Sequence, residues 1–275
     1  MKQLTILITL LIFQSFALSP LYAQKSNKTK TKKVHEVEIT GDIQPDPIAR
    51  KARPDRHPKA IPMPSIAGKS VNPDNHMHGI DISHHQGRIN WDEVARDPKV
   101  GYVYMKATEG TNITDNMYSY NFAECKRLGL KVGSYLFFRP QYSARAQFEH
   151  FVSVVDTKKQ DLLPLIDVEV TNGVSTTTLQ MRLLELCDLF EKEYGKKPLI
   201  YTGKNFYNNH IHSNMQLRTY KYFIAAYSFI EPTLYSDDDF LMWQYSAQGS
   251  IRGIRGNVDC SRFVGRHTIN EIMYR

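Results

Sequence analysis

The amino-acid sequence predicts an α/β fold and, within that class, a reduced (β/α) barrel of eight strands. Strand-like apolar runs alternate with helical patterns from residue 78 to about residue 206, which is typical of a parallel sheet covered by helices. Three more strand-like runs follow at spacings too short for helical crossovers. This pattern fits a barrel smaller than the usual ~250-residue form, with an open doubly wound sheet as the alternative.

Five pairs of strand and helix are expected in the first part of this region. The strands are predicted at residues 78–84, 101–108, 131–138, 162–170 and 198–203. The helices are predicted near Trp91, across 116–129 and 143–155, from about Thr176 to Tyr194, and near Phe206. The long fourth helix has the clearest limits, because Ser175 offers an N-cap and Gly195 a stop.

The last part of the chain lacks amphipathic helix patterns. Strands are predicted at residues 221–228, 240–246 and 257–264, with short connections rich in Asp, Gly and Ser between them. These three strands complete the predicted barrel.

The first 23 residues are typical of a secretory signal peptide. Lys2 provides the positive start, an apolar run follows, and the small-residue pattern before Gln24 offers a cleavage site. The apolar run is shorter than the ~20 residues of a spanning helix, which disfavours an uncleaved membrane anchor. We expect export to a periplasm or to the outside of the cell, with no stable membrane span after cleavage.

Residues 24–77 are predicted to form a basic, proline-rich linker without a core. They hold 7 of the chain's 13 prolines and almost no aromatic residues, so they bury too little apolar surface to offset conformational entropy. Val34–Ile39 alternates like a strand, and a short edge strand is the alternative there.

The positive charge of the chain lies mainly in this linker. Of the formal net charge of +7, the linker carries 11 basic against 6 acidic residues, whereas residues 78–275 carry 23 against 22. The folded part is therefore nearly neutral, and we predict no nucleic-acid partner. The linker is expected to be solvated, with association to an anionic surface polymer as the alternative.

The three cysteines, Cys125, Cys187 and Cys260, lack the spacing of metal ligands. Cys125 and Cys187 fall on helical patterns and are predicted to be small buried apolar residues. One disulfide among the three stays open as an alternative.

Polar residues gather late in the predicted strands, where a (β/α) barrel carries its active site. Strands with only a structural role would not repeat this pattern. The candidate residues are Asp81, Lys106, Glu109, Tyr135, Asp167, Glu169, Tyr201, Tyr227, Gln244 and Asp259.

Four of these candidates are carboxylates that should share one site. If the barrel closes, the first strand neighbours the last, which brings Asp81 beside Asp259. Asp167 and Glu169 are two residues apart in a strand and so point to the same side. Since like charges at close range do not all ionise, at least one carboxyl should have a raised pKa. A protonated acid beside ionised carboxylates is what glycosidic cleavage requires.

The aromatic residues near the strand ends suit a sugar substrate. Aromatic faces stack on pyranose rings, while hydroxyl and amide groups bind the ring substituents. About half of these aromatics are expected to belong to the core instead. Strand alternation favours Tyr135 and Trp243 as members of the site, with Gln244 as a polar contact.

Seven motifs occur in order along residues 78–265: GIDISHHQG, VYMKATEG, GSYLFFRP, LPLIDVEV, PLIYTG, MWQYS and VDCSRF. Each motif alone is weak, but the ordered set resembles the glycoside hydrolase family 25 lysozymes, the Chalaropsis-type N-acetylmuramidases. The resemblance implies a reduced TIM-like (β/α)5(β)3 barrel. It also implies hydrolysis of the β-1,4 bond between N-acetylmuramic acid and N-acetylglucosamine in peptidoglycan, without a cofactor.

The resemblance assigns roles to the four carboxylates. The family's Asp-x-Glu motif falls on Asp167 and Glu169, which makes Glu169 the implied general acid. Asp167 would orient the substrate's 2-acetamido group, which itself attacks the anomeric carbon in such substrate-assisted enzymes. Asp81 and Asp259 match the first and last acidic positions, with electrostatic or water-positioning roles.

Two motifs depart from the family pattern. Residues 135–137 read Tyr-Leu-Phe where the family commonly has Tyr-His-Phe, and residues 259–261 read Asp-Cys-Ser where it has Asp-Leu-Asn. Neither change removes a carboxylate, so they bear on substrate preference rather than on the reaction.

Three other interpretations compete with this one. A metal-dependent hydrolase could use the clustered histidines, although only His84 and His85 lie at the C-terminal end of the first strand, whereas His76 and His78 lie at its N-terminal end, away from the site. A non-catalytic peptidoglycan-binding barrel is disfavoured by the four retained acidic positions. The third alternative pairs Asp167 and Glu169 structurally with Lys106 or Arg139.

Overall fold

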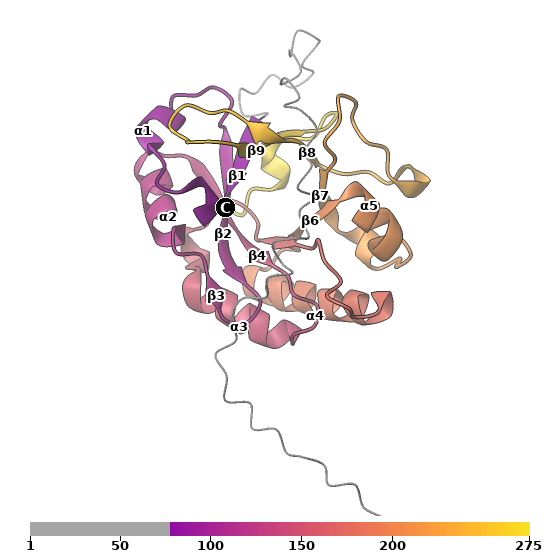
Figure 1. The fold of residues 1–275 in the computed structure, drawn as a ribbon. Helices are drawn as coiled ribbons and strands as arrows, with labels where there is room; N and C mark the ends of the chain where they lie inside the picture. The colour runs from indigo at the N-terminus through magenta and orange to yellow at the C-terminus, as the bar shows by residue number, and fades with distance from the viewer. Residues whose placement is uncertain (1–77) are drawn as a thin grey trace, which may run out of the picture. The chain divides into compact units, whose positions relative to one another are not determined.

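The described part of the chain, residues 78–275 of a computed structural model, is a closed barrel with helices outside it (Figure 1). The predicted signal peptide and linker, with the possible strand Val34–Ile39, lie outside the described residues. Strand β1 (His78–Ile82) pairs both with β2 (Tyr102–Glu109) and with β9 (Val258–Phe263). This closure confirms the reduced TIM-like (β/α)5(β)3 barrel and excludes the open doubly wound sheet.

Eight of the nine strands in residues 78–275 form the barrel wall. The other wall strands are β4 (Lys131–Phe137), β5 (Leu165–Asp167), β6 (Leu199–Gly203), β7 (Lys221–Ala225) and β8 (Met242–Gly249). Pairing is parallel from β1 around to β8, whereas β9 runs antiparallel to both of its neighbours. The ninth strand, β3 (Ile113–Thr114), pairs with β2 and was not predicted, because two residues leave no periodicity to detect.

The helices follow the predicted order. They are α1 (Trp91–Val94), α2 (Tyr118–Arg127), α3 (Ala144–Val154), α4 (Thr176–Tyr194) and α5 (Lys204–Phe206), the last continuing into a π-helical turn over Tyr207–Ile211. Short 3-10 turns occupy His84–Gln86, Thr157–Lys159, Leu217–Thr219, Tyr235–Asp237 and Ile269–Glu271. The Ser175 hydroxyl caps α4 by accepting from the Thr178 amide, and Gly195 ends the helix with a φ of 67°, as predicted.

Side chains of the wall strands alternate between two apolar layers. On β2, Tyr102 and Tyr104 belong to the cluster inside the barrel, whereas Val103 and Met105 belong to the larger cluster between strands and helices. Leu165 and other apolar residues complete the interior cluster. The barrel is therefore filled, and the space for a ligand lies above this filling, at the carboxyl ends of the parallel strands.

The three cysteines lie in the described region, and each is buried and unbridged. Burial raises the pKa of the Cys125 and Cys187 thiols, so both act as the small apolar residues that were predicted. Cys260 is also a buried thiol, and burial is the main cause that raises its pKa to about 12.

Within residues 78–275, no helix has the length and the apolar character that crossing a membrane would require.

The filling of the barrel includes a close approach on β4. A Cβ added to Gly133 would lie 2.3 Å from the Tyr104 ring and 3.0 Å from Leu162 Cβ. The Tyr104 ring is held in place by its hydroxyl, which donates to the Leu163 carbonyl at 3.1 Å. An added Cβ would therefore require the ring or the backbone of β4 to shift.

We expect Gly133→Ala to lower the free energy of unfolding by about 1–3 kcal/mol, the usual range for overpacking a filled core. Urea unfolding followed by tryptophan fluorescence measures this change. Gly203→Ala is the matched control, because a Cβ there meets nothing within 4 Å and the backbone φ is ordinary at −71°. Equal stability of the two variants would contradict the packing described for the interior.

Candidate active site

Asp167 and Glu169 sit at the open end of β5, on backbone that is fixed from both sides. The Asp167 carbonyl accepts from the Phe138 amide at 2.8 Å, and the Val168 amide donates to the Tyr201 carbonyl at 2.9 Å. The Val168 side chain is buried in the outer layer, whereas Asp167 is only 7% exposed and Glu169 is exposed. The strand therefore ends with one buried and one accessible carboxylate at the mouth of the barrel, which is the end formed by the carboxyl ends of the parallel strands.

Asp81 and Asp259 face each other across the β1–β9 pair. Asp259 lies near the start of β9, not late in its strand as the sequence analysis expected. Because β9 is antiparallel, its start reaches the same end of the barrel as the end of β1, so the two carboxyls still meet. Their side chains are joined by a hydrogen bond. Two ionised carboxylates are both acceptors only, so this bond requires one shared proton.

Each of the four carboxylates lies close enough to raise the pKa of a tyrosine beside β5. Burial raises the pKa of Tyr135, and the charges of Asp167, Asp81 and Asp259 raise it further. Burial and then the charge of Glu169 likewise raise the pKa of Tyr201. Tyr135 and Tyr201 flank β5 on β4 and β6, so the predicted convergence of the carboxylates at the mouth is present in the structure.

Gln244 connects the tyrosines to Asp81. This fully buried side chain accepts hydrogen bonds at Oε1 from the Tyr201 and Tyr227 hydroxyls, both at 2.8 Å. Its Nε2 donates to both carboxyl oxygens of Asp81, at 2.9 and 3.0 Å. In this orientation the tyrosines donate to the amide oxygen and the amide nitrogen faces Asp81. Gln244 was predicted to bind substrate, but here it positions a carboxyl.

Asp81 is the member of this cluster whose pKa is raised. Burial raises its pKa well above the ordinary 3.8, and the neighbouring charges of Asp259 and Glu169 raise it further. The hydrogen bond from Gln244 acts in the opposite direction, because it favours the ionised form. The raised pKa expected for one member of the set thus falls on Asp81.

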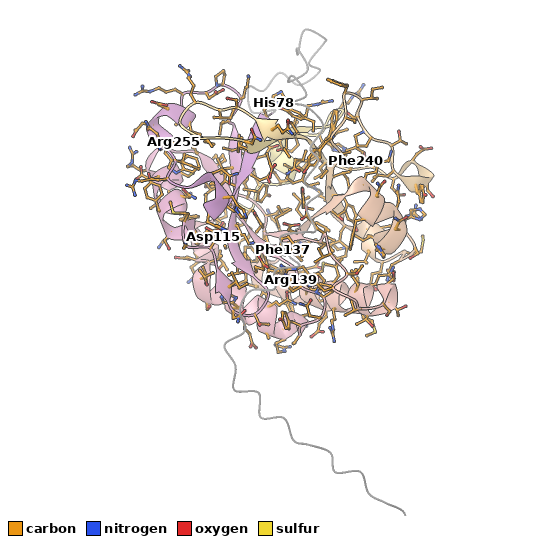
Figure 2. All side chains as sticks on the ribbon, in the orientation of Figure 1. His78, Asp115, Phe137, Arg139, Phe240 and Arg255 are labelled. Carbon is orange, nitrogen blue, oxygen red and sulfur yellow. The ribbon has the colours of Figure 1, made fainter. Side chains whose placement is uncertain are left out.

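Lys106, Glu109 and Arg139 form a separate ion cluster beside β2 and β4. Lys106 Nζ lies 2.5 Å from Glu109 Oε2, and Arg139 binds the other oxygen of the same carboxylate. Burial opposes ionisation of Glu109, but the two cations lower its pKa. Both cations also lie over the Phe137 ring, with Arg139 at 4.7 Å from its centroid, and Figure 2 shows Phe137 and Arg139 as neighbours.

Both cations that the structural alternative would pair with Asp167 and Glu169 bind Glu109 in this cluster. Lys106 and Glu109, which the sequence placed among the candidate site residues, thus belong to this ion cluster.

Trp243 is not part of the mouth, and its prediction as a substrate contact is wrong. It is 2% exposed, lies in the outer apolar cluster, and donates from Nε1 to the Ala226 carbonyl at 2.7 Å. Arg262 covers its ring. The alternation on β8 is the reason, since Gln244 points inward and its neighbours Trp243 and Tyr245 must point outward.

The histidines do not form a metal site in residues 78–275, where no three His, Cys, Asp or Glu side chains are placed to hold an ion. His84 Nδ1 bonds to the buried Asp115 at 2.8 Å, and its ring contacts that of His85. His78 lies near Tyr245, and burial followed by the charges of Arg262 and Lys99 lowers its pKa to about 4. His76 lies outside the described residues.

A groove of about 610 Å³ lies over the ends of β6 and β7. Tyr227 lines it, and the hydroxyl of the same residue donates to Gln244 at 2.8 Å, which links the groove to the site. Phe206 and the 80% exposed Ile230 add apolar surface, and Asn205 adds a polar amide. The sequence analysis missed Phe206 and Ile230, because only exposure in the fold distinguishes them from core residues.

The comparisons with known proteins agree with this geometry. The family description "Glycosyl hydrolases family 25" matches residues 80–254. The chain is 35% identical over 205 residues to the uncharacterized protein YegX of Escherichia coli strain K12, covering 71% of this chain and 72% of YegX. It is 32% identical over 201 residues to lysozyme M1 of Streptomyces globisporus, covering 69% of this chain and 68% of that protein.

A solved structure gives the same result for the fold. The bacterial lysozyme from Streptomyces coelicolor superposes with a TM-score of 0.63 at 30% sequence identity, covering 69% of this chain and 93% of that one. The family match spans more than half of the chain and includes three of the four carboxylates at the mouth. The chain therefore belongs to glycosyl hydrolases family 25 and is a glycoside hydrolase.

Proposed function

We propose that this protein is an exported N-acetylmuramidase that cleaves the β-1,4 bond between N-acetylmuramic acid and N-acetylglucosamine in peptidoglycan. The observation that carries the proposal is the meeting of Asp167 and Glu169 with the Asp81–Asp259 pair at one barrel mouth. The relatives named as lysozymes support the choice of substrate. The signal-peptide pattern of residues 1–23 and the basic linker of 24–77 support export, followed by a catalytic domain over 78–275.

In the proposed reaction, Glu169 is the general acid. Its carboxyl donates a proton to the glycosidic oxygen as the bond from that oxygen to C1 of muramic acid breaks. Its exposure at the end of β5 lets it reach a bound glycan strand. After the leaving sugar departs, the same carboxylate accepts a proton from the attacking water, which returns Glu169 to its starting state.

Asp167 acts on the other side of the anomeric carbon. The 2-acetamido oxygen of the substrate attacks C1 and forms a cyclic intermediate, which water opens again. The nitrogen of that ring becomes positive, and the buried Asp167 carboxylate orients its N–H and stabilises the charge. The hydrogen bonds on both sides of β5 keep Asp167 and Glu169 in a fixed relation during these steps.

The Asp81–Asp259 pair controls the charge around this reaction. By sharing one proton, the pair carries one negative charge instead of two, which leaves Glu169 facing a less negative neighbourhood. The remaining charge favours the positive anomeric centre of the transition state. The groove beside Tyr227 offers stacking surface and an amide for the sugar rings that extend from the cleaved bond.

We predict that Glu169→Gln lowers kcat/KM on purified peptidoglycan by about 10²- to 10⁴-fold, the usual contribution of a general acid. The release of soluble fragments from labelled peptidoglycan measures the rate, and circular dichroism checks the fold. Glu149→Gln, at an exposed position on α3, is the matched control and should keep the wild-type rate. A Glu169→Gln enzyme as fast as the control would refute the proposed role.

A second prediction concerns the stability of Asp81→Asn as pH changes. Because the folded chain keeps the Asp81 proton to a higher pH than the unfolded chain, this group's contribution to stability is greatest at low pH and is lost as pH rises toward the folded pKa. An asparagine removes that loss and can still donate to Asp259. Urea midpoints should therefore favour the variant over wild type more at pH 7 than at pH 4.

The matched control for this measurement is Asp188→Asn, at an exposed position on α4. It should shift the midpoint equally at the two pH values. The same pH-independent shift for Asp81→Asn would mean that Asp81 does not carry the raised pKa.

A further inference from the structure

A second groove, distinct from the one beside Tyr227, lies at the rim of the same barrel end. Its volume is about 970 Å³, and it lies between the segment after β1 and residues 250–257, which join β8 to β9. Figure 2 shows Arg255 of that connection on the side of the barrel where Figure 1 shows α1. Nothing in the proposed cleavage step uses this groove.

The walls of this groove are fixed by contacts between distant parts of the chain. The Asn90 amide donates to the Gly253 carbonyl at 2.9 Å, and Gln86 Nε2 donates to the Asn257 carbonyl at 3.2 Å. Gly253 has a φ of 91°, and an added Cβ would lie 2.3 Å from the Asn90 carbonyl oxygen, so a side chain there would push the two walls apart. The groove is therefore a built feature and not a chance gap between loops.

The charge of the groove favours an anionic ligand. Among the described residues that line it, Arg88 and Arg255 are cationic and Glu93 is the one carboxylate. The Arg88 guanidinium is held 4.3 Å from the Tyr120 ring centroid, and the Tyr120 hydroxyl donates to the Ile89 carbonyl at 2.9 Å. Arg88 is thus oriented in advance by a cation–π contact, which reduces the entropy lost on binding.

The groove is close to the carboxylates along the chain. Arg255 lies four residues before Asp259, and Gln86 lies five residues after Asp81. Four residues span at most about 14 Å even when fully extended. A short peptide of three or four residues covers a similar ~10–14 Å. A peptide attached to a sugar in the site therefore has the length to reach the arginines.

We propose that this groove binds the acidic peptide stem carried by the muramic acid of the substrate, an inference that rests on the proposed function. The stem is a short peptide linked through the lactyl group of that sugar, and it bears several carboxylates. Arg88 and Arg255 bind those carboxylates, and Glu93 accepts from the amide or amino groups of the stem. The enzyme thereby distinguishes peptide-bearing glycan from bare glycan.

The test compares two substrates that differ only in the stem. Peptidoglycan glycan strands are prepared with their stems and, in parallel, after an amidase has removed the stems. For the double variant Arg88→Gln/Arg255→Gln, we expect the ratio of kcat/KM on stem-bearing glycan to kcat/KM on stem-free glycan to fall about three- to tenfold, as for loss of exposed charge pairs. The salt dependence of this ratio should also weaken.

Two control variants accompany this measurement. Arg266→Gln should leave the ratio unchanged, because Arg266 is exposed beyond the far end of the antiparallel β9. Arg255→Lys should keep most of the preference for stem-bearing over stem-free glycan, since it keeps the positive charge. An unchanged ratio in the double variant, or the same loss on both substrates, would overturn the assignment of the groove to the stem.

A binding measurement separates this inference from the proposed function. Glu169→Gln is titrated calorimetrically with a soluble disaccharide that carries its peptide and with the bare disaccharide. Tighter binding of the first, lost in the Arg88→Gln/Arg255→Gln background, supports the groove even if the wild type cleaves neither glycan. Equal binding of the two ligands refutes it even if cleavage occurs.

Discussion

The pairing of β1 with both β2 and β9 is the constraint on which the site depends. The seven parallel strands, β1, β2 and β4 to β8, could form an open sheet with their carboxyl ends side by side along one edge. The pairing of β1 with β2 and β9 closes the sheet, so these ends surround a single site. The antiparallel direction of β9 also matters, because it brings the beginning of that strand, and with it Asp259, to the mouth. The hydrogen bond between the Tyr102 and Ser261 side chains joins β2 to β9 across β1, inside the barrel.

Closure brings four carboxylates close together, and the surrounding side chains reduce the repulsion between them. Four carboxylates at one mouth repel one another, and burial adds to the unfavourable energy of ionisation. The shared proton between Asp81 and Asp259 removes one charge, and the Gln244 amide, whose oxygen accepts from Tyr201 and Tyr227, donates to the Asp81 carboxyl. Glu109, a fifth carboxylate nearby, is neutralised by Lys106 and Arg139. The reactive pair on β5 is thus the part of the cluster that is left to face a substrate.

Much of this arrangement could be predicted from the sequence, because it follows from periodicity and topology. All eight wall strands and the limits of α4 come from apolar patterns and capping residues, and the Asp81–Asp259 contact comes from closure alone. Trp243 was assigned to the wrong layer, since a motif with aromatic residues on both sides of Gln244 does not reveal which face is the interior. The contact of Gln244 with Asp81 and that of Arg88 with Tyr120 join residues more than 30 positions apart, and such contacts carry no local signal in the sequence.

The most direct test of the proposed reaction is hydrolysis of purified peptidoglycan in water enriched in oxygen-18, followed by mass analysis of the fragments. Cleavage by the proposed route places the heavy oxygen at C1 of a new reducing-end N-acetylmuramic acid. The rate at which this label appears should be about 10²- to 10⁴-fold lower for Glu169→Gln than for the wild type. Label at the reducing end of N-acetylglucosamine, or intact glycan after prolonged digestion, would contradict the assignment of this barrel mouth as a muramidase site.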